Sequence, residues 1–445
     1  MTEVTAREQM ILELINRARL DPAGEAARFG IDLNKDLAAG TITAGPKQVL
    51  ALNPFLNAAA DAHSLWMLNQ DIFSHTGVGN STPGDRMGDA GYVFSGGWSW
   101  GENIAWSGTT GTVNADAAAI QHHENLFRSA GHRLNILNDF FREAGVGSIT
   151  GQFGAYNAQM TTEAFATSGA GHFVTGVVYD DADSDDFYSI GEGRSGRVVE
   201  LLQNGSAVAS STSGTAGGYA LGTGITGQAE LRFSGGGLAA PMGVSLQISG
   251  ANLKADLVDG GTILTNASAI LTRQSVGLTL IGIENISGTG NGLDNIITGN
   301  SGANRLGGGG GNDIFLGSGG RDFIRGNSGN DRIDGGSGSD RLSGNAGSDQ
   351  FVFKSVAEAR DTITDFVSGV DRIDLSAIDA VAGGANDNFH FIGAAEFGVS
   401  PAGDLRFEKT ATRTYIEGDV NGDGLADFHI TLESVITLTS GDFIL

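Results

Sequence analysis

The stretch that decides the fold runs from Gly290 to Val352, and it divides without interruption into GNGLDNIIT, GNSGANRLG, GGGGNDIFL, GSGGRDFIR, GNSGNDRID, GGSGSDRLS and GNAGSDQFV. These seven units of nine residues follow the pattern G-G-x-G-x-D-x-U-x, in which U is a large apolar residue. The first six positions predict a tight turn, because glycine tolerates the positive φ angles that such a turn requires. The last three predict a short strand with U directed inward. The unbroken period argues against the alternative interpretation, a flexible glycine-rich linker.

Two units should complete one coil of a parallel β-roll, so that alternate units stack on the same side. The inner apolar residues then form two columns, Ile297, Phe315, Ile333, Phe351 and Leu306, Ile324, Leu342. The aspartates stack in the same way, as Asp313, Asp331 and Asp349 on one side and Asp322 and Asp340 on the other.

A bare column of carboxylates would be unstable. Neighbouring strands lie ~4.8 Å apart, where two carboxylates repel each other by roughly 3.5 kcal/mol at an effective dielectric constant of 20. We therefore predict Ca²⁺ between successive turns, bound by these aspartates and by carbonyl oxygens of the turns. The first two units carry Asn295 and Asn304 at this position, which predicts weaker sites there or none.

This repeat is typical of RTX proteins, and the chain resembles that family. The resemblance implies export from a bacterial cell through a type I secretion channel, guided by an uncleaved C-terminal signal. The end of the chain, SGDFIL, is similar to such a signal, because Asp442 precedes three apolar residues. The chain would leave the cell unfolded and fold in millimolar calcium outside. We therefore expect a secreted protein, extracellular or on the cell surface.

The composition agrees with several domains outside the cell. The chain has 445 residues, 71 of them glycine, and a net charge of -25. Acidic residues gather in particular loops and no basic patch is present, so cation sites are favoured and a nucleic-acid partner is not expected. There is no cysteine, so disulfides are excluded and calcium would have to stabilise the fold. The N-terminus lacks a Sec signal pattern, and no apolar run is long enough to span a membrane.

Residues 1–168 carry four motifs in order: FSH (73–75), GENIA (101–105), SAGHRLNIL (129–137) and GVG (145–147). In this order they resemble the CAP superfamily, which includes cysteine-rich secretory, antigen 5 and plant PR-1 proteins, and in particular its bacterial branch. The resemblance implies an α-β-α sandwich with a central antiparallel sheet. Helical patterns at 5–20, 53–70 and 115–129 agree with it.

The family resemblance also implies a cleft with two histidines and two acidic residues, which bind a divalent metal in some members. His75, Glu102 and His132 match three of these places. The second acidic residue is expected about where Ser129 stands, and Glu124 lies more than one turn earlier. Two imidazoles and a carboxylate could hold Zn²⁺ or act as an acid/base group. The alternative is that His132 and Glu102 only hydrogen-bond within the fold.

The remaining histidines of this region are weaker candidates. His63 lies beside Trp66 and Met67 on a helix, which predicts a structural or surface role. His122 and His123 are expected to be partly exposed on the alanine-rich helix, and either could line the cleft. The sequence His123 to Phe127 begins like the zinc-protease motif H-E-x-x-H, but phenylalanine stands where the second histidine must be.

Two acidic loops resemble the ligand spacing of EF-hand calcium sites. The first offers carboxylates at loop positions 1, 3, 5 and 12, namely Asp181, Asp183, Asp185 and Glu192. The second offers ligands at positions 1, 3, 5 and 9, namely Asp419, Asn421, Asp423 and Asp427. Each predicts a calcium site between strands, and an acidic turn without an ion is the alternative.

The expected fold class is multidomain, α+β and all-β. We predict the CAP-like sandwich at 1–168 and a small β-sandwich spacer at 169–250, which resembles the B-type repeats of bacterial surface proteins. An irregular β cap at 251–289 and the roll at 290–352 follow. Residues 353–445 should form a C-terminal β cap with the export signal, similar to the segment after the roll in serralysin-like proteases. There Asp361, Asp365 and Asp371 are further candidate ligands.

Three functions follow from these patterns. The first is a secreted calcium-binding CAP protein whose cleft binds an unknown ligand. The second is a metal-assisted hydrolase that uses His75, Glu102 and His132 around a bound water. The third is a surface or adhesion protein in which the roll itself is the functional part. The missing second acidic residue favours the first over the second, so the protein is expected not to be an enzyme.

Overall fold

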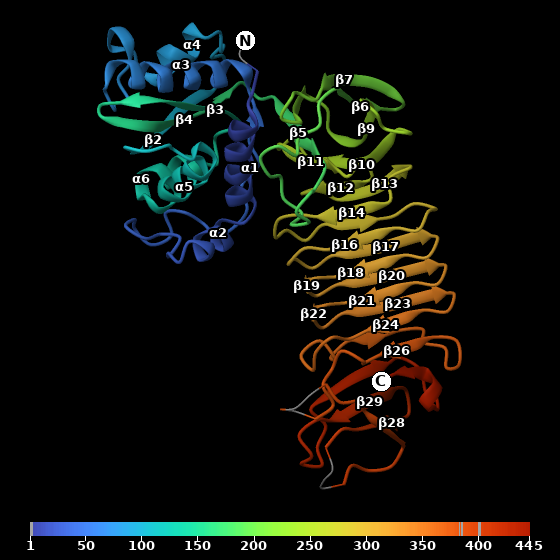
Figure 1. Cartoon of the computed structure of the whole chain (residues 1–445). Coiled ribbons are helices and arrows are strands. Elements are labelled where there is room, and N and C mark those ends of the chain that lie inside the picture. Colours follow the sequence, from blue (N-terminus) through green and yellow to red (C-terminus); the bar gives the residue numbers. More distant parts are fainter. Residues whose placement is uncertain (1–2, 382, 384–385, 399–401) are drawn as a thin grey trace. The chain divides into compact units, whose positions relative to one another are not determined.

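A computed structural model describes residues 3–381, 383, 386–398 and 402–445. The chain forms two compact units, residues 1–266 and 267–445, and Figure 1 shows the elements of each. None of the described helices is both long and apolar enough to cross a membrane.

The first unit begins with a four-stranded sheet between two layers of helices. The strands lie in the order β1 (Ala51–Leu52), β3 (Glu143–Phe153), β4 (Tyr156–Ser168), β2 (Trp98–Thr109). β3, β4 and β2 are antiparallel, and β1 runs parallel to β3. The helices are α1 (Ala6–Leu20), α2 (Pro22–Arg28), α3 (Pro54–Gln70), α4 (Pro83–Asp89), α5 (Ala115–Arg128) and α6 (Ala130–Ile136), with a short η1 at Val78–Asn80. Figure 1 shows α3 and α4 on one face of the sheet and α5 and α6 on the other, which confirms the expected sandwich.

Local sequence signals position these helices. Thr5 and Glu8 form a capping box at the start of α1, and Asn53 caps α3 just before Pro54. The GVG motif lets α3 approach the sheet closely, because a Cβ atom at Gly145 or Gly147 would lie 2.1 Å or 2.3 Å from the helix backbone. On the opposite face, apolar side chains of α1, α5 and the sheet form a buried cluster that includes Ile15 and Phe127.

Residues 172–265 form a β-sandwich with four strands in each of its two layers. One layer contains β7 (Ser206–Thr212), β6 (Arg197–Gln203), β9 (Gly227–Gly235) and β10 (Met242–Ile248), in this order. The other contains β8 (Gly218–Thr223), β5 (His172–Tyr179), β11 (Leu253–Val258) and β12 (Thr262–Thr265). β11 pairs in parallel with β5 and antiparallel with β12, so 253–265 continues the layer that β5 begins. Every residue of β11 is buried, as a strand between two neighbours and two layers requires.

The second unit contains a parallel β-roll built from two ladders of short strands. One ladder is β13 (Ala269–Arg273), β15 (Ser287–Thr289), β17 (Arg305–Gly310), β20 (Phe323–Ser328), β23 (Arg341–Ala346), β25 (Thr362–Ile363). The other is β14 (Gly277–Leu280), β16 (Ile296–Thr298), β18 (Ile314–Leu316), β21 (Arg332–Asp334), β24 (Gln350–Val352), β26 (Arg372–Asp374). The short β19 (Gly319–Gly320) and β22 (Ser337–Gly338) pair at the turns. The register aligns Leu306 with Ile324 and Leu342, and Phe315 with Ile333 and Phe351, so the predicted columns are confirmed and buried.

The roll extends beyond the seven units at both ends. β13 and β14 precede them, and β25 and β26 continue the ladders although the nine-residue period has stopped. β28 (Asp404–Lys409) and β29 (Thr414–Asp419) follow as an antiparallel hairpin. β27 (His390–Gly393) pairs in parallel with β28, and β30 (Phe428–Leu432) pairs antiparallel with β29. The chain ends with η2 (Ser440–Asp442) and β31 (Phe443–Ile444), which pairs with β26. The segment expected to be an export signal is therefore folded against the roll.

Candidate functional site

The aspartates of the roll form the predicted columns. Oδ1 of each accepts a hydrogen bond from the backbone N–H eighteen residues earlier, for example from Asn295 to Asp313 and from Asp313 to Asp331, both at 2.8 Å. The pattern repeats on the other side, where Asp322 donates to Asp340 at 2.7 Å. The second oxygen, Oδ2, is buried and without a hydrogen-bond partner in all five, namely Asp313, Asp322, Asp331, Asp340 and Asp349. Burying five carboxylate oxygens without a hydrogen bond is costly unless a cation or a proton compensates their charge.

The first glycine of each unit leaves room beside this oxygen. A Cβ atom added at Gly308 would lie 1.9 Å from Oδ2 of Asp313 and 2.6 Å from the carbonyl oxygen of Gly326, one coil further. At Gly326 the same atom would lie 2.0 Å from Oδ2 of Asp331 and 2.7 Å from the carbonyl oxygen of Gly344. A carboxylate oxygen and a main-chain carbonyl therefore converge on a space that no side chain fills. Oxygen donors of this kind fit Ca²⁺.

Burial also disfavours the charged form of the column aspartates. Burial raises the pKa of Asp313 and Asp322 to about 7 and the pKa of Asp340 and Asp349 to about 6, although a backbone N–H on each carboxylate favours its charged form. Burial likewise raises the pKa of Asp331. A divalent cation beside Oδ2 would reverse this effect by favouring the carboxylate.

The columns continue past the last unit. Asp361 and Asp371 accept from the N–H groups of Asp340 and Asp349 at 2.8 Å and 3.0 Å, over separations of 21 and 22 residues. The short insertions lie in the turns and leave the stack intact. Oδ2 of Asp361 is also buried without a hydrogen-bond partner, and burial raises its pKa to about 8. Asp365 instead accepts hydrogen bonds from Ser343, Gly344 and Asn345.

The two asparagines of the column complete their hydrogen bonds within the protein. Oδ1 of Asn304 accepts from the N–H of Asn300 at 2.9 Å, and its Nδ2 donates to the carbonyl oxygen of Ile286 at 3.1 Å. Oδ1 of Asn295 accepts from the N–H of Asn291 at 2.8 Å. The amide of Asn304 thus uses its oxygen as an acceptor and its NH₂ group as a donor. It has no second oxygen that would need a cation, unlike the aspartates of the column.

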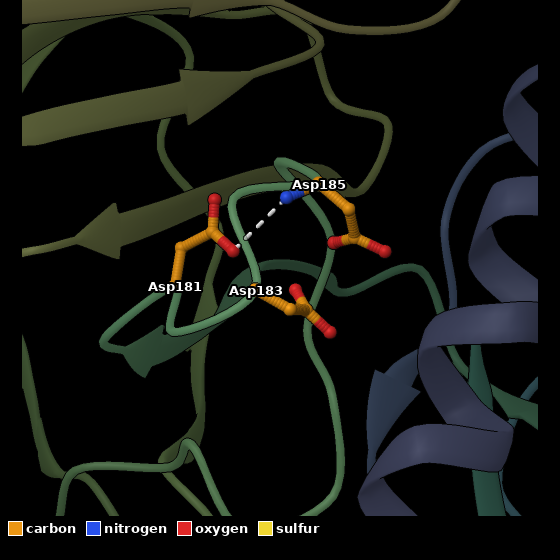
Figure 2. Close-up of side chains that lie close together, drawn as sticks. All are labelled: Asp181, Asp183 and Asp185. Atoms are coloured by element: carbon orange, nitrogen blue, oxygen red, sulfur yellow. Dashed lines mark hydrogen bonds between the residues drawn. The ribbon is translucent and has the colours of Figure 1, made fainter.

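The first acidic loop, between β5 and β6, brings together three of its four predicted ligands (Figure 2). Asp181, Asp183 and Asp185 can each place one carboxylate oxygen within 4.8 Å of the others. Glu192 is buried and accepts hydrogen bonds from the N–H groups of Ala182 at 2.8 Å and Ser189 at 2.7 Å, so it closes the loop from behind.

The second acidic loop joins β29 to β30. Asp419 is buried and accepts from the N–H groups of Gly422 at 2.6 Å and Gly424 at 2.9 Å. Nδ2 of Asn421 donates to Asp427 at 2.9 Å, and Asp423 accepts from the N–H of Leu425 at 2.9 Å. Within the described parts of the chain, only the loop of Asp181 gathers three acidic or histidine ligands this closely.

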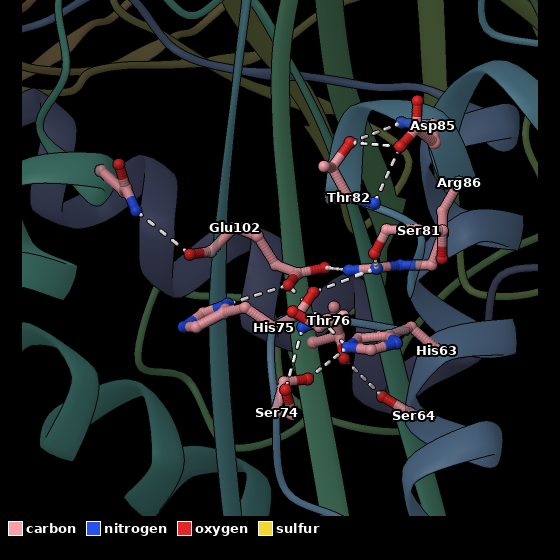
Figure 3. A network of polar contacts seen from close by, with 12 residues as sticks. His63, Ser64, Ser74, His75, Thr76, Ser81, Thr82, Asp85, Arg86 and Glu102 are labelled. Atoms are coloured by element: carbon pink, nitrogen blue, oxygen red, sulfur yellow. Dashed lines mark hydrogen bonds and ion pairs between the residues drawn. The ribbon is translucent and has the colours of Figure 1, made fainter. Parts of the chain in front are cut away.

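In the first unit, Glu102 is the centre of a polar network (Figure 3). It lies on β2, where Oε1 is 2.9 Å from Nδ1 of His75 and Oε2 is 2.5 Å from Arg86 of α4. Arg86 also donates to the carbonyl oxygen of His75 at 3.1 Å. Arg86 neutralises the buried carboxylate, and the carboxylate orients the imidazole. No sequence spacing pointed to Arg86, because α4 reaches Glu102 only in the folded protein.

His132 is the second histidine that the family resemblance implies. Its Nδ1 lies 2.9 Å from Oγ of Ser129, so a serine stands at the place of the expected second acidic residue. Partial burial, together with the nearby imidazole of His75, lowers the pKa of His132 and favours its neutral form. Glu124 does not replace the missing acid, since it pairs with Arg128 at 2.8 Å on the surface.

These residues do not form a three-ligand zinc site. Both oxygens of Glu102 already have partners, and His75, Glu102 and His132 do not bring one ligand atom each within 4.8 Å of the others. The arrangement instead presents two imidazoles, one of them oriented by a carboxylate. Such a pair could accept or donate protons or hydrogen bonds to a bound ligand.

The expectation of partly exposed His122 and His123 is wrong, because both are buried between α5 and the layers beside it. His122 lies 2.8 Å from Oγ of Ser107 and 2.9 Å from Oγ1 of Thr161, and burial lowers its pKa to about 4. His123 lies 3.2 Å from Glu25. The sequence pattern of α5 shows that the two histidines are polar. It does not show that buried hydrogen-bond partners for them come from other elements of the fold.

His63 is also buried, with Nε2 2.9 Å from the carbonyl oxygen of Ser74 and its ring stacked on Trp66. Its Nε2 is 3.9 Å from Oε1 of Glu102. His63 therefore supports the loop that carries His75, in agreement with a structural role.

Comparisons with known proteins assign two parts of the chain to families. Residues 12–174 match the family described as "Cysteine-rich secretory protein family" (CAP), and residues 254–445 match "Peptidase M10 serralysin C terminal". No curated protein sequence matches the chain.

Solved structures are similar to parts of the chain. An extracellular protein with an SCP domain from Bacillus anthracis str. Ames is 23% identical over 36% of this chain and 39% of its own, with a TM-score of 0.24. This chain thus spans well under half the length of that protein. A subunit from the Azotobacter vinelandii mannuronan C5-epimerase is 27% identical over 34% of this chain and 78% of its own, with a TM-score of 0.18.

The first match covers the sheet and helices that carry His75, Glu102 and His132, and the second includes the roll that carries the aspartate columns. The chain therefore combines a CAP domain at residues 12–174 with a serralysin-type C-terminal domain at residues 254–445.

Proposed function

We propose that this is a secreted protein whose roll folds on binding extracellular calcium and whose CAP domain binds a ligand in the cleft between His75 and His132. The observation that carries the calcium proposal is the set of buried, unpartnered Oδ2 atoms of Asp313, Asp322, Asp331, Asp340 and Asp349. Without a cation, folding would bury these oxygens with no compensation. With Ca²⁺ between successive coils, the same oxygens become ligands.

Calcium would then act as a switch for folding. Extracellular calcium modules bind at ~10⁻⁴ to 10⁻³ M, so the roll would stay unfolded in the cytoplasm and fold outside. Several sites that bind only the folded state make folding steep in calcium concentration. An unfolded chain suits passage through a type I secretion channel, which is the export route we propose. The CAP match and the absence of a membrane-spanning helix among the described residues are compatible with a secreted protein.

The test is a calcium titration of the full chain followed by circular dichroism. We expect a steep gain of β-structure near millimolar calcium. Asp331→Asn should raise the midpoint several-fold and lower the steepness, because it removes a central ligand. Glu284→Gln is the matched control, since it removes one exposed negative charge from the same unit and should leave the midpoint unchanged. If calcium leaves the spectrum of the full chain unchanged, the proposal is wrong.

The two acidic loops are proposed as further calcium sites. Asp181, Asp183 and Asp185 would coordinate the ion directly, while Glu192 holds the loop closed. Asp419, Asn421, Asp423 and Asp427 would form the second and weaker site, since this loop lacks a glutamate at position 12. Isothermal titration of Asp183→Asn and Asp423→Asn should each show fewer bound ions than the parent chain. An unchanged ion count would remove the corresponding loop from the proposal.

Metal-assisted hydrolysis is the second candidate function, and the oriented His75 is the observation in its favour. A zinc ion would have to be held by Nε2 of His75 and by His132, with water completing its shell, and it would supply a polarised water. Metal analysis of the purified chain decides the matter. One zinc per chain that is lost in His132→Ala would support this function, and no zinc would leave the cleft as a ligand-binding site.

A further inference from the structure

Strand β2 forms the open edge of the CAP sheet. Within the described residues it pairs only with β4. Nδ2 of Asn135 donates to the carbonyl oxygen of Glu102 at 3.2 Å, so this carbonyl points away from β4. In an antiparallel pair, the N–H and C=O of one residue point to the same side, and alternate residues point the same way. Trp98 and Trp100 therefore also direct their backbone N–H and C=O groups to the open edge.

Large apolar side chains are exposed beside this edge. Trp98 is 54% exposed, Trp100 38% and Phe140, in the loop between α6 and β3, 76%. Together with Asn138, Arg142 and Thr167 they line a pocket of about 580 Å³, a size typical of ligand sites. Soluble proteins rarely leave several aromatic side chains exposed at one place without a binding role.

The walls of this pocket are held in place before any ligand arrives. The N–H of Phe140 donates to Oδ1 of Asn138 at 2.9 Å. The fully buried Arg19 donates to the carbonyl oxygens of Ile136 at 2.7 Å and Asn138 at 3.0 Å. A preorganised site loses little conformational entropy on binding, so these contacts favour recognition over accidental exposure.

The opposite wall is fixed in the same way. Ser95 donates its N–H to Oγ of Ser168 at 3.0 Å, and Oγ of Ser168 donates to the carbonyl oxygen of Val93 at 2.7 Å. The ring of Phe94 packs against Trp98, with the ring centroids 5.2 Å apart. The indole of Trp98 is thereby held at the rim of the pocket.

Asn135 closes the edge at Glu102, but at Trp98 and Trp100 the edge lacks the usual protection against strand pairing. Sheets guard open edges with lysine, proline, bulges or inward charges. β2 reads WSWGENIAWSGT, and its single charged residue, Glu102, is engaged by Arg86 and His75. An exposed sheet edge next to a pocket for side chains is the arrangement by which domains bind extended peptides through strand addition.

We propose that the edge of β2 at Trp98 and Trp100 binds an extended peptide segment by strand addition, with apolar side chains of the peptide packed on Trp98 and Phe140. Alternating donors and acceptors at strand spacing match a polypeptide backbone better than a glycan. The same edge leads to Glu102, whose side chain orients His75. The inference thus names a ligand class for the cleft and rests on the proposed function of that cleft.

The experiment uses the full chain in calcium and a library of random linear peptides. Peptides that bind are resynthesised with N-methyl groups on alternate amides. N-methylation of one alternating set, the set that faces β2, should weaken binding at least tenfold, whereas methylation of the other set should have little effect. Equal effects of both sets, or of neither, would exclude strand addition. Failure of any peptide to bind would overturn the proposal, and so would binding of glycans only.

Two variants of one residue separate the contributions of the side chain and the backbone. Trp98→Thr removes the indole and keeps the N–H, and should weaken peptide binding several-fold. Trp98→Pro also removes the outward N–H, which no bond within the sheet uses, and should weaken binding roughly tenfold further. Val208→Thr, at an exposed position of β7, is the control and should change nothing. Equal affinities of Trp98→Thr and Trp98→Pro would overturn the strand-addition geometry.

The outcomes also separate this inference from the function on which it rests. Circular dichroism of the same samples reports whether calcium folds the roll, whatever the peptides do. Peptide binding that is lost in His132→Ala but unchanged in both Trp98 variants would keep the cleft as a ligand site and overturn the β2 edge. A dimer in sedimentation that Trp98→Pro abolishes would identify a second copy of the chain as the occupant and overturn the peptide proposal.

Discussion

Glycine serves two different purposes within one nine-residue unit of the roll. At the first position its backbone is unstrained, and the missing side chain leaves space for a carboxylate and a carbonyl oxygen, as at Gly326. At the fourth position the backbone itself requires glycine, as at Gly329 with φ +124°, where a Cβ atom would also lie 1.8 Å from a neighbouring carbonyl oxygen. The first glycine therefore belongs to the ion site that we propose, and the fourth belongs to the turn.

Gly326→Ala should weaken calcium-dependent folding, because its Cβ atom would lie 2.0 Å from Oδ2 of Asp331. We expect the calcium midpoint to rise at least several-fold in a dichroism titration. Gly310→Ala is the matched control, since its nearest neighbour would be 3.4 Å away and its φ is not positive. A Gly326→Ala variant with the parent midpoint would show that this space holds no ion.

Glu163 is a buried acid whose effect on stability depends on pH. It lies on β4, Asn103 donates to its Oε2 at 2.9 Å, and burial raises its pKa to about 7. Because the folded pKa lies above the unfolded value, the stabilising contribution of the protonated form is present at low pH and is lost as pH rises through about 7.

Glu163→Gln should therefore stabilise the CAP domain at pH 8 by about 2 kcal/mol and change little at pH 5. Gln keeps an oxygen acceptor for Asn103 and removes the buried charge. Chemical unfolding at both pH values, monitored by tryptophan fluorescence, measures the difference. An equal effect of the substitution at pH 5 and pH 8 would contradict the assigned titration.

At the scale of elements, a buried ion triad joins the CAP helices to the β-sandwich. Nζ of Lys254 on β11 lies 2.7 Å from Glu13 of α1 and 2.5 Å from Asp256. Burial alone would lower the pKa of Lys254, but the two carboxylates raise it, and burial raises the pKa of Asp256 to about 6. Buried charges therefore join the sandwich to the CAP helices.

Lys254→Met should destabilise the first unit by about 3 kcal/mol, because it leaves two buried carboxylates without a cation. The double variant Lys254→Met with Glu13→Gln should recover part of the loss. Lys35→Met, at an exposed position, is the control. Thermal unfolding followed by differential scanning fluorimetry provides the comparison, and a Lys254→Met variant as stable as the control would show that the triad contributes nothing.

At the scale of the molecule, we expect the two units to depend on calcium to different degrees. The CAP domain has an ordinary apolar core, whereas the roll buries a column of acids along its length. Trypsin in the presence of a calcium chelator should therefore cleave first within 267–445, at arginines such as Arg305, Arg325 and Arg332. Added calcium should protect these sites at least tenfold. Equal digestion of the roll with and without calcium, measured by mass spectrometry, would contradict this division.

Short-range periodicity was enough to predict the roll and its columns. A nine-residue repeat determines which residues point inward and which stack, because each coil repeats the one before, and the register of Phe315, Ile333 and Phe351 follows directly. Motif order was likewise enough to identify the CAP domain and to place His75 beside Glu102. These features depend on residues that are close in the sequence or belong to a known pattern.

Long-range packing decided the rest. Arg86 neutralises Glu102, and His122 and His123 are buried. None of these has a local signal, because each depends on which faces of distant elements meet. A sequence shows that a side chain is polar, but only the folded chain decides whether it meets solvent, an opposite charge or an ion.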